Sequence, residues 1–181
     1  MISPPTVKAN ITEESSRIVD MNILSNLIPN RWEKLSTGNR LDILQTICNV
    51  EVAYLGISTP ITVEADNLSE SIRGSYCDQM RLIQINLDHL EKDLPQSILH
   101  TLLHEIHHGY SARLAELYNS ISPEAKKLRI FYDSSFYAQE VANYIDPKDN
   151  YDQYLAQKME MNAEIYAKMG VKEYYDRIQH G

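Results

Sequence analysis

The segment His104-Glu105-Ile106-His107-His108 constrains this 181-residue chain more than any other feature. It lies among Leu and Ile residues in a stretch whose pattern predicts a helix. On a helix, His104 and His108 lie four residues apart and about 40° apart around the axis, so both imidazoles can bind one metal ion from the same face. Glu105 lies beside the first histidine, where it can accept a proton from a metal-bound water instead of binding the ion. The segment therefore predicts a helix that carries a zinc site.

A plainer interpretation of the same helix is a polar patch made of His100, His104, His107 and His108. Two histidines and a glutamate among Leu and Ile residues would then need buried hydrogen-bond partners. A metal ion satisfies both motif histidines together, which favours the metal site. The motif does not need His100 or His107, and we expect each of these to lie next to the ligands or at the surface.

A catalytic zinc site needs a third protein ligand and leaves the fourth position to water. A metzincin continuation would place Gly and His three and six residues after the motif, but Ser111 and Leu114 occupy these positions. The other arrangement uses a glutamate on a later helix. Glu160 is the best candidate for this ligand, and Glu164 and Glu140 are the alternatives.

Glu160 and Glu164 form a like-charge pair four residues apart, which is mildly destabilising on a bare helix. A nearby divalent cation would reverse the sign of this effect, whereas Lys168 would neutralise Glu164 on an ordinary solvated face. Glu160 also lies 52 residues after His108. A helix predicted over 151–169 therefore has to pack beside the motif helix, and residues 119–150 have to form a helical excursion. The apolar stripe predicted for this packing consists of Leu155, Met159, Ala163 and Tyr166.

The rest of the pattern predicts an α+β fold in a single domain, residues 1–181, in which residues 1–12 form a loose N-terminal arm. Helices are predicted around 13–28 and 38–50, from Pro95 to about Asn119, and over most of the remaining chain, with Gly170 ending the helix over 151–169. The runs between them predict a small, mostly antiparallel sheet, and the last run alternates most clearly. The four predicted strands are Val52–Leu55, Ile61–Val63, Arg73–Tyr76 and Arg81–Leu87.

The composition argues against two classes of partner. Seventeen basic and 25 acidic residues give a net charge of −8, and both halves of the chain are acidic, so no basic face for nucleic acid is expected. No stretch reaches the roughly 18 uninterrupted apolar residues of a transmembrane helix, and the first ten residues do not resemble a signal peptide. We therefore expect a cytoplasmic protein that contacts no membrane, in which Cys48 and Cys77 are reduced thiols.

Because Glu160 and Ala163 follow the H-E-x-x-H segment, the chain resembles the gluzincin branch of zinc metallopeptidases, in which a Glu-x-x-Ala helix follows H-E-x-x-H. It is most similar to poorly characterised zincin-like domains from firmicute chromosomes, prophages and toxin-like proteins, and more loosely to peptidases that cleave repressors of mobile elements. The resemblance spans roughly residues 32–167. It is carried by Trp32, Arg40-Leu41-Asp42-Ile43-Leu44-Gln45, Gly74-Ser75-Tyr76, Ile83-Gln84-Ile85-Asn86, the H-E-x-x-H segment, Tyr154, Gln157, Glu160, Asn162 and Ala163. The chain departs from that pattern at His107, at Gly109-Tyr110-Ser111 and at Asn162, where an acid is expected.

The resemblance implies a zinc metallopeptidase that acts on a peptide or protein substrate. It implies that His104, His108 and Glu160 bind one Zn²⁺ per chain and that Glu105 is the general base. Zincins hold the substrate antiparallel to the edge strand before the motif helix, which the sequence places at Arg81–Leu87. Further residues are then expected around the ligands: Gln84 and Asn86 in the cleft, Tyr137, Tyr144 or Tyr166 as a transition-state donor, and Asn162 and Glu164 beside the ligands.

Two other functions remain compatible with the same motifs. One is a regulatory or interaction protein that keeps the zincin fold without catalysis, although a purely structural metal site has no use for Glu105. The other is a toxin effector that a partner system exports and that acts as a peptidase in a target cell.

Overall fold

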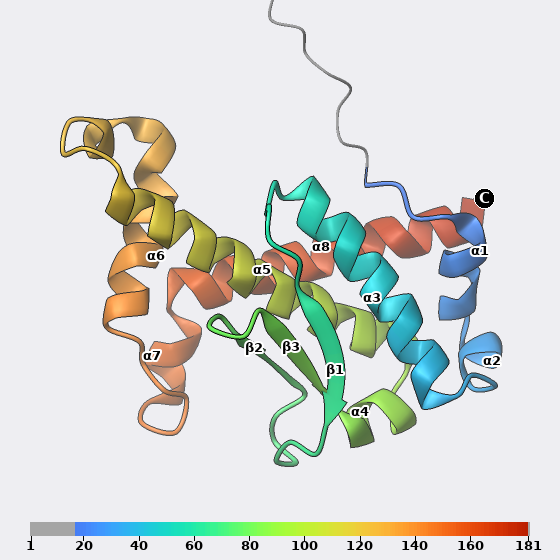
Figure 1. Ribbon diagram of the computed structural model, residues 1–181. Coiled ribbons are helices and arrows are strands. Elements are labelled where there is room, and N and C mark those ends of the chain that lie inside the picture. Colours follow the sequence, from blue (N-terminus) through green and yellow to red (C-terminus); the bar gives the residue numbers. More distant parts are fainter. Residues whose placement is uncertain (1–16, 181) are drawn as a thin grey trace, which may run out of the picture.

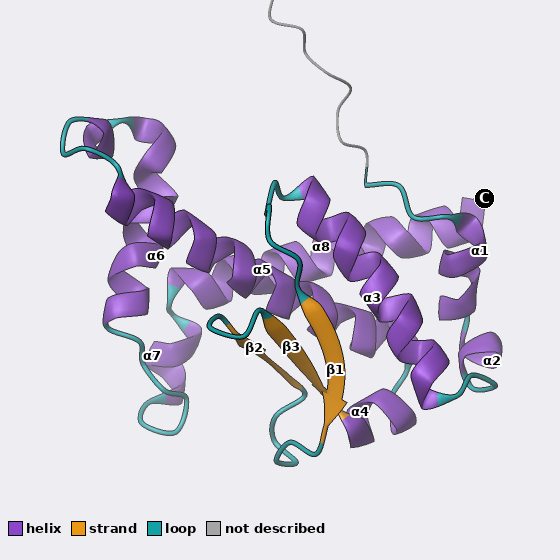
Figure 2. Cartoon of the chain, viewed as in Figure 1, coloured by secondary structure: helices purple, strands orange, loops and turns teal. Residues whose placement is uncertain are grey.

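The structure is a computed structural model that describes residues 17–180, so the predicted arm over 1–12 and the start of the predicted helix over 13–28 lie outside the described residues. The chain forms short helices first, then a small sheet, then a largely helical second half (Figures 1 and 2). The predicted α+β class is confirmed for this part of the chain. The first elements are α1 (Met21–Leu24), η1 (Ser25–Leu27), α2 (Pro29–Trp32) and α3 (Thr37–Tyr54).

The sheet has three strands, β1 (Thr62–Asp66), β2 (Gly74–Cys77) and β3 (Leu82–Asn86), in the order β1-β3-β2. Strand β3 pairs antiparallel with β2 but parallel with β1. The sheet is therefore mixed, not mostly antiparallel. The strand expected at the edge, Arg81–Leu87, corresponds to β3 and lies in the centre. Leu82, Ile83, Ile85 and Asn86 are all buried there, as a central strand requires.

The predicted strand Val52–Leu55 is wrong, because Val52 to Tyr54 form the last turn of α3. Helix α3 begins at a Ser36 cap, whose hydroxyl accepts a hydrogen bond from the Asn39 amide at 3.2 Å. Val52 is buried on the same helical stripe as Ile47 and Cys48. Packing of this stripe outweighs the strand preference of Val.

Helix α5 (Pro95–Ser120) is the central element of the molecule and is the helix predicted from Pro95 to about Asn119. It contacts α3, β2, β3, α6 and α8. The short helix α4 (Leu87–Lys92) joins β3 to it. The α5 residues that face the core are Ile98, Leu99, Leu102, Leu103 and Ile106, all fully buried.

After α5 the chain makes the predicted helical excursion and returns. The excursion consists of η2 (Ala125–Lys127), η3 (Arg129–Phe131), α6 (Tyr132–Ala142) and α7 (Tyr151–Leu155). It projects to the left of the sheet in Figure 1. The chain then enters α8 (Lys158–His180), which packs along α5. The helix predicted over 151–169 is thus divided at Ala156 and Gln157, and it continues through Gly170 instead of ending there.

Within residues 17–180, none of the helices combines the length and the apolar character needed to cross a membrane.

Candidate metal centre

Three potential metal ligands converge where α5 and α8 pack together. The Nε2 atoms of His104 and His108 lie 3.0 Å apart, and the Glu160 carboxylate oxygens lie 3.4 Å from the first and 3.5 Å from the second. Two ligand atoms bound to one zinc ion at tetrahedral angles lie about 3.4 Å apart. The donor set, two imidazole nitrogens and one carboxylate, is also that of a catalytic zinc site. These residues therefore fit a zinc ion in both spacing and chemistry.

Glu160 reaches this point because of the break before α8. The helix starts at Lys158, and the Glu140 carboxylate accepts hydrogen bonds from the backbone amides of Lys158 at 2.7 Å and Met159 at 2.8 Å. Glu140, one alternative for the third ligand, is therefore engaged as a cap from α6. Glu160 then lies in the first turn of α8, with its side chain buried beside α5.

Tyr154 on α7 holds the outer side of the same carboxylate. Its hydroxyl donates a hydrogen bond to Glu160 Oε2 at 2.7 Å. Burial and this carboxylate raise the pKa of Tyr154, so the hydroxyl keeps its proton. Sequence reasoning assigned Tyr154 no role. Its only signal was its position in the Tyr-x-x-Gln-x-x-Glu segment.

Glu105 lies beside His104 on the sheet side of α5 and is buried, with 8% of its surface exposed. Burial raises the pKa of its carboxyl to about 7, and a hydrogen bond from the Tyr76 backbone amide on β2 acts in the opposite direction. Strand β2 can approach closely because of Gly74, where an added Cβ would lie 2.6 Å from Thr101 Cγ2 and 3.4 Å from Glu105 Cγ. The expected base is therefore held by the edge strand next to the motif.

The three candidate ligands shift one another's pKa values. Burial favours neutral His104, but the Glu160 hydrogen bond and nearby carboxylates outweigh it and raise the pKa of His104. Burial lowers the pKa of His108 to about 4, so this imidazole keeps a lone pair free. Burial would raise the pKa of Glu160, but His104, His108 and Tyr154 together lower it. A carboxylate and a neutral imidazole are the forms that bind a metal.

Glu164 lies one turn after Glu160, beside the group and not in it. Its carboxylate is 3.9 Å from His104 Nδ1, 3.3 Å from His100 Nε2 and 2.9 Å from Lys168 Nζ. It thus faces the ring nitrogen of His104 that does not point at the other ligands, the position of an outer carboxylate in histidine metal sites. The ion pair with Lys168, expected on a solvated face, is present as well.

The expected cleft residues are largely engaged elsewhere. Asn86 is buried, and its amide donates to the backbone carbonyls of Ile72 at 2.8 Å and Ser69 at 3.1 Å, so it anchors the loop before β2. Gln84 donates to Asp66 Oδ2 on β1 at 2.6 Å, toward the sheet edge far from β2. Both residues lie on the central strand, which has no free edge.

Of the three tyrosines, Tyr144 is the most exposed. Tyr137 is 2% exposed and accepts a hydrogen bond from Asn162 Nδ2 at 2.6 Å. The Tyr166 hydroxyl donates to Glu51 in the core. Tyr144 is exposed, and burial of part of its ring together with the Glu160 and Glu105 carboxylates raises its pKa.

The two histidines that the motif does not need differ from each other. His100 lies beside Glu164 at the edge of the group, as expected. His107 is not at the surface: it is buried among the rings of Tyr110, Tyr137 and Tyr166. Burial lowers the pKa of His107 to about 4, so it is a neutral core residue.

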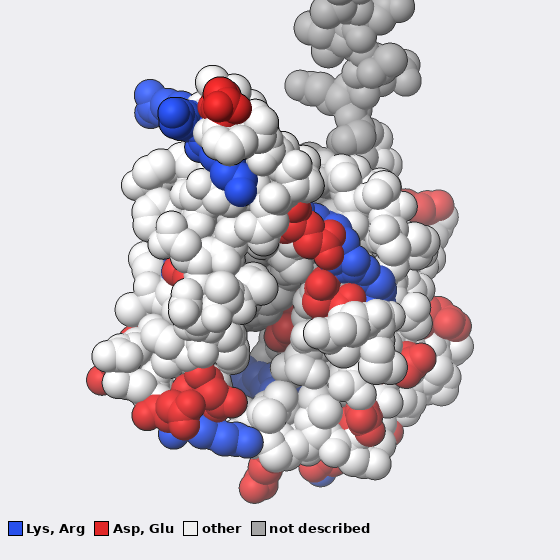
Figure 3. Space-filling view, turned by 60° about the vertical axis from the view of Figure 1, so that its left-hand side comes forward, with Lys and Arg blue, Asp and Glu red and all other residues white. Residues whose placement is uncertain are grey.

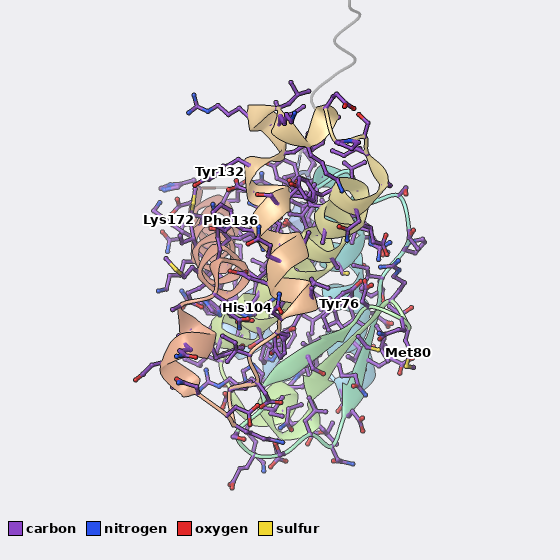
Figure 4. All side chains as sticks on the ribbon, turned by 90° about the vertical axis from the view of Figure 1, so that its left-hand side faces the viewer. Tyr76, Met80, His104, Tyr132, Phe136 and Lys172 are labelled. Carbon is purple, nitrogen blue, oxygen red and sulfur yellow. The ribbon has the colours of Figure 1, made fainter. Side chains whose placement is uncertain are left out.

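The face that carries these residues is hollowed between the helical excursion and the sheet (Figure 3). Figure 4 shows His104 and Tyr76 near the middle of the molecule, and Met80 further out in the turn between β2 and β3.

The chain matches no family model, no curated protein and no solved structure. The candidate centre therefore rests on the geometry of this chain alone.

Proposed function

We propose that this chain is a zinc-dependent metallopeptidase with a zincin-like fold. In this proposal His104, His108 and Glu160 hold one Zn²⁺, and Glu105 is the general base. The observation that carries the proposal is the convergence of the three ligand atoms within 4.8 Å of one another, with Glu105 enclosed beside the first of them. A purely structural metal site would not need the buried, hydrogen-bonded carboxylate of Glu105 at this position.

A bound zinc ion would polarise the scissile carbonyl and acidify a water molecule. The chain's own residues supply the rest. The Glu105 carboxylate accepts the proton of the attacking water and passes it to the leaving amine, and its raised pKa suits a group that both takes and releases a proton near neutral pH. The Tyr76 backbone amide keeps this carboxylate oriented.

Strand β2 is the edge that a peptide substrate would meet. Strand β2 lies at the edge of the sheet, and its Tyr76 amide points away from β3 but is already bound to Glu105. A peptide can add to such an edge through backbone hydrogen bonds, which give affinity without requiring a particular sequence. This moves the expected substrate strand from β3 to β2. Tyr144 is the tyrosine best placed to donate a hydrogen bond to the transition state.

Glu105→Gln tests the catalytic part of the proposal. The amide keeps the size of the side chain but cannot accept the proton, so hydrolysis should fall by at least 100-fold while zinc content and thermal unfolding stay close to wild type. The measurement is cleavage of an unbiased peptide mixture by mass spectrometry, together with elemental analysis of the same samples. Glu33→Gln, at an exposed position away from the site, is the matched control.

A Glu105→Gln protein that cleaves peptides at the wild-type rate would remove Glu105 as the base. A wild-type protein that holds zinc and cleaves no peptide in the mixture would contradict the peptidase assignment itself.

A further inference from the structure

A second feature lies one helical turn from the candidate centre, on the side of His100. It is a cavity of about 660 Å³ between the start of α5, the second half of α8 and the residue before β2. His100 lines it together with Arg73, Ser97, Lys168, Lys172 and Asp176. We call this cavity the basic pocket.

The charge of the basic pocket is opposite to that of the molecule. The chain carries a net charge of −8, yet the pocket lining has three cations, Arg73, Lys168 and Lys172, and one carboxylate, Asp176. A local group of cations inside an acidic surface attracts a small anionic group but repels a long polyanion.

Of the three cations, Arg73 has no ion-pair partner among the described residues, and the two lysines are held only in exposed pairs. Among residues 17–180, Arg73 has no carboxylate within 4 Å, and its only side-chain partner is Ser97 Oγ at 3.5 Å. Lys172 pairs with Asp176 and Lys168 with Glu164, both as exposed pairs four residues apart on α8. Exposed pairs of this kind contribute little to stability, and the lysines can be shared with another anion. The guanidinium of Arg73 can bind a carboxylate through two parallel hydrogen bonds.

The basic pocket adjoins the start of the strand proposed to pair with the substrate. Arg73 directly precedes Gly74, the first residue of β2. A peptide paired with the free edge of β2 would therefore leave the strand beside Arg73. On the other wall, His100 Nε2 lies 3.3 Å from Glu164, whose carboxylate also faces His104.

We propose that the basic pocket binds the carboxylate of an acidic side chain of the peptide substrate, so that the enzyme selects peptides with Glu or Asp at this position. Arg73 is the main contact and Lys172 the second, and the apolar side chains of Val171 and Tyr175 contact the aliphatic part of the substrate side chain. The inference rests on the proposed peptidase function, because it names the substrate class of the same site.

The test measures binding without turnover. The protein is the full chain carrying Glu105→Gln. The probe is a neutral-dye-labelled, C-amidated peptide Ala-Ala-Glu-Glu-Ala-Ala, compared with its Gln-Gln counterpart by fluorescence anisotropy. The first variant adds Arg73→Gln and Lys172→Gln. The matched control adds Lys127→Gln and Arg129→Gln, which remove one Lys and one Arg from the tip of the excursion, where Lys and Arg side chains gather in Figure 3.

We expect the Glu peptide to bind at least tenfold more tightly than the Gln peptide. The pocket variant should lose this preference while the control keeps it. Equal affinities for the two peptides, failure of both to bind at millimolar concentration, or an equal loss in the control would overturn the proposal. A preference for the Glu peptide together with no hydrolysis by the wild type would support the pocket and contradict the peptidase function. Hydrolysis by the wild type without a preference for the Glu peptide would support the peptidase function and contradict the pocket.

Discussion

At the scale of single residues, the orientation of the Glu160 carboxylate depends on the hydroxyl of Tyr154. Tyr154 is the side chain that donates to Glu160 Oε2, and it comes from a different helix, α7, than the carboxylate it holds. Without this hydrogen bond the carboxylate can rotate away from His104 and His108. Groups that orient metal ligands in this way contribute strongly to metal affinity although they do not touch the ion.

Tyr154→Phe is therefore expected to weaken zinc binding by about 10–100-fold while the fold is retained. The measurement is competition for zinc against a chromophoric chelator. Tyr151→Phe is the control, because Tyr151 is exposed and stacks on the Tyr154 ring without reaching Glu160. Equal zinc affinity in Tyr154→Phe and wild type would show that the hydroxyl does not orient the ligand.

The sequence predicted which three residues converge at the candidate centre better than it predicted the side chains around them. His104 and His108 lie four residues apart on one helix, so local geometry is enough to bring them together. Glu160 was predicted from its position on a later helix, and it does lie beside both histidines. The tyrosines could not be sorted in advance, because the direction of each hydroxyl depends on tertiary partners such as Asn162 for Tyr137 and Glu51 for Tyr166.

At the scale of elements, Gly170 allows α8 to lie close to α5. A Cβ at this position would lie 2.8 Å from Leu103 Cδ1 and 2.9 Å from Arg17 Nη2. Leu103 is fully buried, and Arg17 is held by Glu51, so neither can move away freely. Gly170, which the sequence predicted at the end of a helix, therefore lies inside the continuous helix α8, where its lack of a side chain lets α5 pack closely.

Gly170→Ala should destabilise the protein by about 1–3 kcal/mol, since overpacking outweighs the gain of about 1 kcal/mol in helix propensity. Gly38→Ala in the first turn of α3 is the control, because the nearest atom to its added Cβ is Ser36 Oγ at 3.9 Å. This control should be neutral or stabilising. Urea unfolding followed by circular dichroism measures both variants. A stabilised Gly170→Ala protein would contradict the close packing of α5 and α8.

The elements that the sequence mispredicted share a physical cause. The local sequence pattern shows whether a segment is a helix or a strand, but not which other segments it packs against. Those tertiary contacts decide how strands pair and where helices break. The alternation of Ile83 and Ile85 indicated a strand, whereas its parallel pairing with β1 depends on how the chain returns through β2. In the same way, the break at Ala156 and Gln157 depends on the Gln157 side chain, whose Oε1 accepts from the Ile145 amide at 3.2 Å.

At the scale of the whole molecule, a buried ion pair joins three distant segments. Arg17 donates to both oxygens of Glu51 on α3, at 2.5 and 2.6 Å, and Glu51 also accepts hydrogen bonds from Tyr166 and Tyr174 on α8. Glu51 is fully buried and Arg17 nearly so. This network fixes α8 against α3 and so supports the part of α8 that carries Glu160.

Glu51→Ala should destabilise the protein by about 3–5 kcal/mol, because it leaves the buried Arg17 charge without a partner. Glu173 is the matched control: it accepts from the same guanidinium at 2.8 Å, but its side chain is 42% exposed. Glu173→Ala should cost less than about 1 kcal/mol. Urea unfolding measures both, and equal losses would contradict the central position of Glu51.

The central claim is that His104, His108 and Glu160 together hold one zinc ion. Its most direct test is the zinc content of the purified full chain, measured by elemental analysis after dialysis against metal-free buffer. We expect about one zinc per wild-type chain, almost none in the His104→Ala, His108→Ala double variant, and a strong loss in Glu160→Ala with a smaller loss in Glu164→Ala. A double variant that keeps the full zinc content, or a wild-type protein that binds none when zinc is supplied, would contradict it.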